Sequence, residues 1–180
     1  LATCPAGNLT VETNAALHAL ARSASDEDLD ALARGEVRGE FQVRLAAFLE
    51  RFGHRSEASW ELMSPRWRRH PERLVPLLRS QRRVDAEPPD DRARHQEERH
   101  QEALAELRSA LSGPRLTTAE LLVHYTRRYL LLRENQRFWF DRLLSSMQDT
   151  LLALGAWAVA EDWLDEADDV AFLTWPEVQG

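Results

Sequence analysis

Lysine and isoleucine are both absent from the 180-residue chain, so all 23 of its basic residues are arginine. Without lysine, the chain has no side-chain amine for a Schiff base and no lysine to bind a phosphate. Both missing residues have AT-rich codons, and we interpret their absence as codon bias in a GC-rich genome. The alternative is that arginine is favoured for its planar, bidentate pairing.

Cysteine, glycine and long apolar runs are also scarce. The one cysteine, Cys4, excludes an internal disulfide, and 7 glycines with no Asn-Gly or Asp-Gly pair argue against β-hairpins. No apolar run approaches about 18 residues, and the opening residues Leu1–Thr3 do not resemble a signal peptide. We therefore expect a cytoplasmic protein that does not enter a membrane. The first residue, Leu1 rather than Met, suggests a piece of something longer.

Acidic residues outnumber basic ones. The formal net charge is −7 and the pI is about 5.4, which argues against nucleic-acid binding through a basic surface. The chain is 43% hydrophobic and 29% charged, as is typical of globular domains. We expect a single helical domain over residues 1–180, with an internal linker at 83–91, taken from a larger multidomain protein.

Helical patterns dominate the first third of the chain. Thr10 is expected to cap a helix that ends near Arg22. Ser25 to Asp28 resembles a capping box and begins a short helix that ends at Gly35. A third helix is predicted from about Gly39 to Phe52, with Gly53 placed to end it. Its apolar residues recur at i, i+4, i+7, i+8 and i+11 and form one face: Phe41, Leu45, Phe48, Leu49 and Phe52.

The remaining helices are longer. Pro71 is expected to begin a helix that Pro76 kinks. A charged helix follows from about Asp90 to Ser112, and Gly113–Pro114 separates it from a helix that Thr117 or Thr118 caps and that ends near Asp162. The sequence therefore predicts an all-α fold: an irregular helical bundle with two long antiparallel helices and a structured loop at 53–70.

The 53–70 loop allows two interpretations. His54 and Arg55 follow a helix C-terminus, where cations are favoured, and Glu61 is placed to accept a bidentate pair from Arg55 or Arg66. These residues and Trp67 either fasten the loop to the bundle or line a pocket. The aromatic residues of the last third of the chain also belong either to the core or to a pocket for a flat ligand: Phe138, Trp139, Phe140, Trp157, Trp163 and Trp175.

Motifs for catalysis are missing. The chain has one Glu-x-x-His, Glu97–His100, where a di-iron bundle uses two, and its histidines are too dispersed for a zinc site. It has no Gly-x-Ser-x-Gly elbow and no glycine-rich phosphate loop. We therefore expect no catalytic residue and no metal ion in this chain. An independent metalloenzyme is the least favoured hypothesis.

Short segments with a recognisable pattern occur along nearly the whole chain. They are 7–14, 48–56, 65–67, 71–72, Arg133–Glu134, Leu154–Gly155 and 164–174. In this order they resemble the phosphoenolpyruvate-utilising enzyme family, in its branch of phosphoenolpyruvate synthase-like proteins and rifampicin phosphotransferases. Leu9, Ser59 and Glu61 depart from the family's pattern.

The resemblance implies the helical region between an ATP-grasp domain and a mobile domain with a phosphorylated histidine. In the rifampicin branch this region binds the antibiotic. ATP and Mg²⁺ are then expected only in the other domains, and the partners are an aromatic small molecule and neighbouring domains of a bacterial, antibiotic-related parent chain. The alternative is a scaffolding domain that docks neighbouring modules. Eight residues are the candidate ligand contacts: His54, Arg55, Trp60, Glu61, Trp67, Arg133, Glu134 and Trp139.

Overall fold

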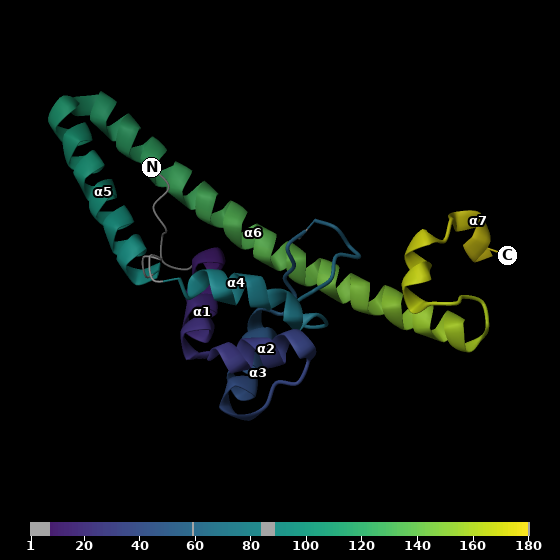
Figure 1. The fold of residues 1–180 in the computed structure, drawn as a ribbon. Helices are drawn as coiled ribbons and strands as arrows, with labels where there is room; N and C mark the ends of the chain where they lie inside the picture. Colours follow the sequence, from purple (N-terminus) through teal and green to yellow (C-terminus); the bar gives the residue numbers. More distant parts are fainter. Residues whose placement is uncertain (1–7, 59, 84–88, 180) are drawn as a thin grey trace.

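The computed structural model describes residues 8–58, 60–83 and 89–179, and these residues form helices without any strand. The predicted all-α fold class is confirmed. Cys4, Ser59 and the 84–88 part of the expected linker lie outside the described residues. The elements, shown in Figure 1, are α1 (Leu9–Ser23), α2 (Asp26–Arg34), α3 (Gly39–Phe52), η1 (Pro71–Arg73), α4 (Leu74–Gln81), α5 (Pro89–Ala110), α6 (Gly113–Ala160), η2 (Ala167–Phe172) and α7 (Trp175–Gln179).

Local signals set the ends of the first three helices. The side chain of Asn8, and not that of Thr10, caps α1 by accepting from the backbone amides of Thr10 and Val11. Ser25 and Asp28 form the predicted capping box of α2. The C-cap of α2 is Gly35, whose φ of 73° lies in the left-handed region that glycine adopts without strain. Helix α3 spans the residues predicted for it.

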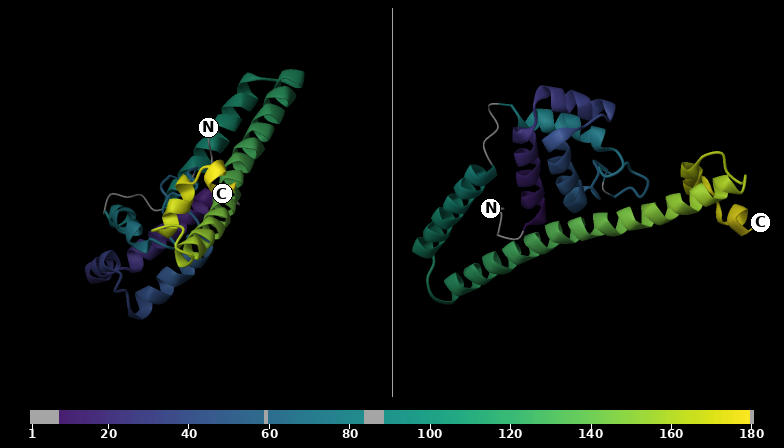
Figure 2. Two further views of the ribbon diagram at one scale, coloured as in Figure 1. Left: turned by 90° about the vertical axis from the view of Figure 1, so that its right-hand side faces the viewer. Right: turned by 90° about the horizontal axis from the view of Figure 1, so that it is seen from below.

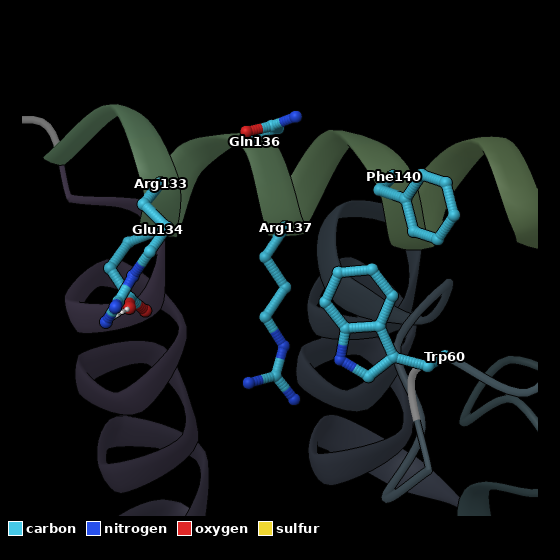
Figure 3. Close-up of a pocket in the computed structure, with 6 residues that line it drawn as sticks. All are labelled: Trp60, Arg133, Glu134, Gln136, Arg137 and Phe140. Carbon is cyan, nitrogen blue, oxygen red and sulfur yellow. Dashed lines mark hydrogen bonds and ion pairs between the residues drawn. The ribbon is translucent and has the colours of Figure 1, made fainter. Parts of the chain in front are cut away.

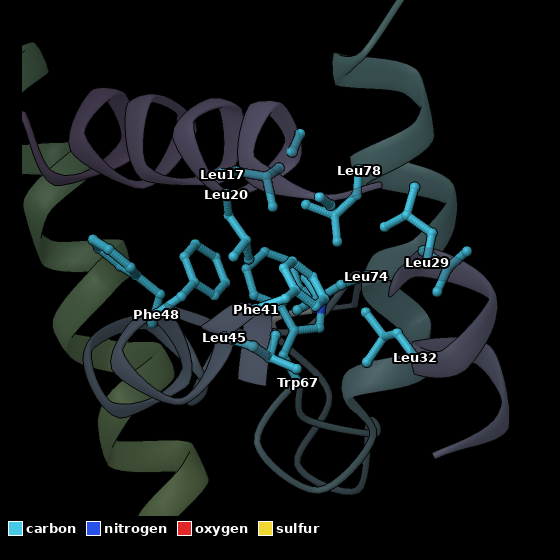
Figure 4. Close-up of a cluster of buried hydrophobic side chains, with 14 of the residues drawn as sticks. Leu17, Leu20, Leu29, Leu32, Phe41, Leu45, Phe48, Trp67, Leu74 and Leu78 are labelled. Atoms are coloured by element: carbon cyan, nitrogen blue, oxygen red, sulfur yellow. The ribbon is translucent and has the colours of Figure 1, made fainter. Parts of the chain in front are cut away.

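Helices α1 to α4 pack around one apolar core beside α6 (Figure 4). Leu29, Leu74 and Leu78 are fully buried in this core. The 53–70 loop contributes Trp67, and α6 contributes Phe138, so both are fastened to the small bundle. Burying a leucine or phenylalanine side chain stabilises a fold by about 1.5–3 kcal/mol, and this core therefore determines where the loop meets α6.

The α-helices that contain Pro76 and Pro114 begin at other residues than predicted. Pro71 begins the short η1 turn, and α4 starts at Leu74, so Pro76 falls in the first turn of α4 and does not kink it. Gly113, with φ of 58°, is the first residue of α6, and Pro114 lies in its first turn. Helix α6 therefore begins before the expected threonine cap.

Helix α6 is the longest element of the structure, and the other helices lie along it. Its 48 residues extend over about 72 Å at about 1.5 Å per residue. Figure 2 shows α1 to α4 on one side of it, with α5 folded back at one end and the C-terminal elements at the other. Ion pairs join α5 to α6 from Arg108 to Glu120 at 2.7 Å and from Arg127 to Glu97 at 3.3 Å, as expected for two antiparallel helices.

Among the described residues, α6 is one helix that meets the length and composition of a membrane span. An 18-residue window in it has a mean hydropathy of 1.2, although the sequence has no uninterrupted apolar run of that length. The inner face of α6 mixes apolar and polar side chains: Phe138 and Leu144 are buried there, and so are Asp141, Ser145 and Gln148. The amide of Gln148 donates to the carbonyl oxygen of Ser64 at 3.2 Å. Polar as well as apolar side chains of this helix therefore pack against the rest of the protein.

Gly155 lets the end of the chain fold back on α6. A Cβ atom at Gly155 would lie 2.0 Å from the carbonyl oxygen of Ala167, at the start of η2. Trp157 and Trp163 meet edge to face at 4.8 Å across the connecting turn. Only glycine permits this approach between α6 and η2.

We expect Gly155→Ala to detach η2 from α6 while the small bundle stays folded, since overpacking of this kind costs about 1–3 kcal/mol. Hydrogen–deuterium exchange checks this: the amides of 167–172 should lose protection and those of α1 to α4 should not. Ala153→Leu, at an exposed position of the same helix, is the matched control. Unchanged protection of 167–172 in Gly155→Ala would contradict the prediction.

Candidate functional site

The 53–70 loop is closed at its base by backbone hydrogen bonds. The amide of Arg68 donates to the carbonyl oxygen of Gly53 at 2.8 Å, and the amide of Trp67 donates to that of Arg55 at 2.9 Å. A Cβ atom at Gly53 would lie 3.0 Å from the Cβ of Arg68. Gly53 ends α3 with a φ of −65°, which any residue can adopt. Its role is therefore to leave room for the segment around Arg68, where the loop returns to α3.

A buried arginine supports the loop from inside. The side chain of Arg66 is 1% exposed, and its guanidinium donates to the hydroxyl of Ser56 at 3.3 Å and to the carbonyl oxygen of Glu61 at 3.0 Å. The carboxylate of Glu61 forms no ion pair with the described residues, so the predicted bidentate pair with Arg55 or Arg66 is replaced by this backbone contact. Arg66 thereby fixes the part of the loop that carries Trp60.

Asp141 provides the negative charge beneath the loop. Its side chain is 1% exposed, and one carboxylate oxygen lies 3.9 Å from Nε of Arg55. Arg55 also donates to the hydroxyl of Thr13 at 2.9 Å. Burial lowers the pKa of the Arg55 guanidinium, while the nearby Asp141 raises it, and the same two causes act on the pKa of Arg66. The loop, α1 and α6 therefore meet around one buried carboxylate.

The start of α1 positions the neighbouring turn of α6. The amide of Leu9 donates to the side-chain oxygen of Asn135 at 3.0 Å, and the hydroxyl of Thr10 donates to a carboxylate oxygen of Glu134 at 3.3 Å. The other carboxylate oxygen of Glu134 accepts from Arg133 at 3.3 Å. Glu134 is therefore held from both sides.

A groove of about 330 Å³ opens between the loop tip and this part of α6 (Figure 3). Trp60 forms one wall, is 68% exposed, and meets Phe140 at a ring-centroid distance of 5.1 Å. The side chain of Arg137 extends into the space between Trp60 and the Arg133–Glu134 pair. The lining residues are Trp60, Arg133, Glu134, Gln136, Arg137 and Phe140. The groove thus combines an exposed indole with guanidinium groups.

Three of the eight candidate residues, Trp60, Arg133 and Glu134, meet in this groove. Sequence reasoning named Phe140 only among the aromatic residues of the core or of a pocket, and it missed Gln136 and Arg137. Their spacing from Arg133, at i+3, i+4 and i+7, places all four on one helix face. This spacing was the available signal, but only the folded loop shows which face of α6 lies opposite Trp60.

The other five candidates lie outside the groove. His54 is 2% exposed, with its ring edge-on to Phe138 at 4.5 Å. Trp67 is buried against Phe48, with ring centroids 6.1 Å apart. Trp139 is 58% exposed beneath the guanidinium of Arg142. Arg55 and Glu61 support the loop as described above.

Burial also determines the charge of His54. Burial, together with the smaller effect of the charges of four neighbouring arginine side chains, lowers the pKa of the imidazole from 6.5 to about 4. Nε2 of His54 has no hydrogen-bond partner among the described residues. The ring is therefore neutral at neutral pH and packs as part of the core.

Metal ligation finds no support in the described part of the chain, where no three His, Cys, Asp or Glu side chains are grouped to hold an ion. The carboxylate of Glu97 accepts from Gln101 at 2.7 Å and pairs with Arg127. His100 is 6% exposed, and burial lowers its pKa. Glu97 of the Glu97–His100 motif thus takes part in joining α5 to α6.

Comparison with models of protein families identifies the family of this chain. A family model described as the rifampicin phosphotransferase fourth domain matches residues 1–134, which include the small bundle, the loop, α5 and α6 as far as Glu134. No curated protein matches the chain. The resemblance to phosphoenolpyruvate-utilising enzymes is confirmed by this match. The chain therefore belongs to the rifampicin phosphotransferase fourth-domain family and is a helical domain of a phosphotransferase-like enzyme.

Proposed function

We propose that the groove between Trp60 and α6 binds the aromatic small molecule on which the parent phosphotransferase-like enzyme acts. One observation carries this proposal: Trp60 is held 68% exposed beside a groove of about 330 Å³ that also contains Arg133 and Arg137. A groove of this size lies at the lower end of the range for small-molecule sites. An exposed indole on a fastened loop is well suited to stack on a flat ring.

In this proposal the domain binds the acceptor molecule, and the other domains of the enzyme carry out the phosphoryl transfer. The chain contains no lysine and no glycine-rich phosphate loop. ATP and Mg²⁺ therefore belong to neighbouring domains of the parent chain, in the cytoplasm. The groove residues would hold the acceptor in position while those domains supply the phosphoryl group.

Loss of the indole is expected to weaken ligand binding. Isothermal titration of the chain with rifampicin and with naphthol should give saturable binding of at least one of them. Trp60→Ala should weaken that binding about fivefold or more, because a stacking contact of this kind contributes about 1–3 kcal/mol. Trp139→Ala is the matched control, since Trp139 is similarly exposed on α6 but does not line the groove. If neither compound binds, or if both variants bind equally well, the proposal fails.

A second proposal, that the domain docks neighbouring modules, rests on the outer face of α6. Large apolar side chains there are each at least 46% exposed: Leu121, Leu122, Tyr125, Tyr129, Leu132, Trp139, Leu143, Met147, Leu154 and Trp157. Exposed apolar side chains in such number on one helix are typical of an interaction site. Chemical labelling of Tyr125 and Tyr129 should therefore be fast in the isolated chain and slow in the intact parent protein. Equal labelling in both would exclude docking at this face.

A further inference from the structure

We propose that the ligand of the groove is an aromatic anion, whose ring stacks on Trp60 and whose carboxylate or phosphate group binds the guanidinium of Arg137. This inference rests on the proposed binding function and names the chemical class of the ligand. Its basis is the position and the charge environment of Arg137.

Arg137 differs from the arginines around it in having no counter-ion. Arg133 pairs with Glu134 at 3.3 Å, and Arg55 lies 3.9 Å from Asp141. Within the described residues, no carboxylate lies within ion-pair distance of Arg137 and no hydrogen bond engages its side chain. Its guanidinium therefore retains all of its donors for a ligand.

The charge of Arg137 also acts on its surroundings. After burial and Asp141, the next influence on the pKa of Arg55 is the positive charge of Arg137, which lowers that pKa. The groove itself contains the cations Arg133 and Arg137 against the single carboxylate of Glu134. An anion bound at Arg137 would balance this excess positive charge.

The geometry gives the ligand two points of attachment. Figure 3 shows the side chain of Arg137 extending from α6 toward the side on which Trp60 lies, with its guanidinium beside the indole. Arg133, Arg137 and Phe140 follow one another at i, i+4 and i+7 on that helix face. A ring that stacks on Trp60 thus carries a substituent to the guanidinium, whose planar fork matches a carboxylate or phosphate group.

The same arrangement selects against other ligands. A cationic aromatic compound meets the repulsion of Arg137 and Arg133 and would have only Glu134, which is already engaged by Thr10 and Arg133. A neutral aromatic compound keeps the stacking contact but forgoes the charge-assisted hydrogen bonds. Such hydrogen bonds contribute enough to favour an anion about tenfold or more over a neutral compound of the same shape.

Three naphthalene derivatives with the same substitution position test this selectivity by isothermal titration: naphthoate, naphthylmethanol and naphthylmethylammonium. The chain is expected to bind naphthoate about tenfold or more tightly than the alcohol, and the ammonium compound most weakly. The preference for naphthoate should fall as sodium chloride is raised. In Arg137→Gln the preference should disappear, because naphthoate should lose far more affinity than the alcohol. Arg137→Lys should keep part of it. Arg128→Gln, an exposed arginine of α6 outside the groove, should keep all of it.

The outcomes separate this inference from the proposed function. If the chain binds all three compounds equally, or if Arg137→Gln retains the preference for naphthoate, the inference is wrong, and the groove still binds rings provided that Trp60→Ala weakens them. If none of the three compounds binds, the proposed function fails and the inference fails with it. Circular dichroism of each variant verifies that it is folded.

Discussion

Asp141→Asn is expected to destabilise the domain by about 3–5 kcal/mol, the cost of removing one partner from a buried ion pair. Asp141 is 1% exposed and lies 3.9 Å from Arg55. Its charge also raises the pKa of the buried Arg66. Without the carboxylate, two largely buried guanidinium groups remain beneath the loop, and Arg55 has only the weaker influence of Glu134 in place of Asp141.

A carboxylate on the same helix provides the matched control. Asp149 pairs with Arg69 at 2.8 Å, but both side chains are more than 40% exposed. Asp149→Asn should therefore change the free energy of unfolding by only about 0–1 kcal/mol. Urea denaturation followed by circular dichroism measures both variants. Equal effects of the two substitutions would show that Asp141 does not organise the loop.

The consequences of Asp141→Asn should reach the groove. Arg55 and Arg66 hold the two sides of the loop, and the carbonyl oxygen of Glu61, next to Trp60, accepts from Arg66 at 3.0 Å. Where the variant is still folded, Trp60 should be less fixed against Phe140, so ligand affinity should fall even though Asp141 does not line the groove. Asp141 is in this sense a positioning residue.

The parts of the fold that sequence predicts well depend on local interactions. The apolar spacing of α3 and the Ser25–Asp28 capping box specify these features within a few residues, and the structure has both where predicted. The cap of α1 was misassigned by two residues because Asn8 and Thr10 are both good capping residues. Likewise, Gly113–Pro114 indicates a boundary between two helices, but the sequence does not show that α6 begins at Gly113 itself.

The groove was harder to predict because α6 departs from the usual amphipathic pattern. Asp141, Ser145 and Gln148 are buried on it together with Phe138 and Leu144, while Trp139 and Trp157 are more than half exposed. Aromatic content alone therefore does not identify the core, and of the aromatic residues of the last third only Phe138 is buried. The meeting of Trp60 with Phe140, 80 positions apart, depends on tertiary packing that periodicity does not contain.

Acid should destabilise the domain through His54. The folded-state pKa of this buried imidazole is about 4, below its ordinary value of 6.5, so the unfolded chain binds the proton more tightly than the folded one. The stability that the neutral ring contributes is therefore fully present above about pH 6.5 and is lost as the pH falls toward 4. The difference in pKa corresponds to about 3 kcal/mol. This loss arises because a charged ring would lie beside Phe138 and the buried guanidinium groups.

His54→Leu isolates this contribution from that of the carboxylates. The variant removes the titrating ring and the Nε2 atom that has no hydrogen-bond partner among the described residues, while leaving an apolar side chain against Phe138. Free energies of unfolding from urea titrations at pH 7, 5.5 and 4.5 should show wild type losing about 2 kcal/mol more than the variant between the two extremes. Equal losses of unfolding free energy in both proteins would mean that His54 has the same pKa in the folded and the unfolded chain. The packing of its ring against Phe138 would then not exclude the charged form.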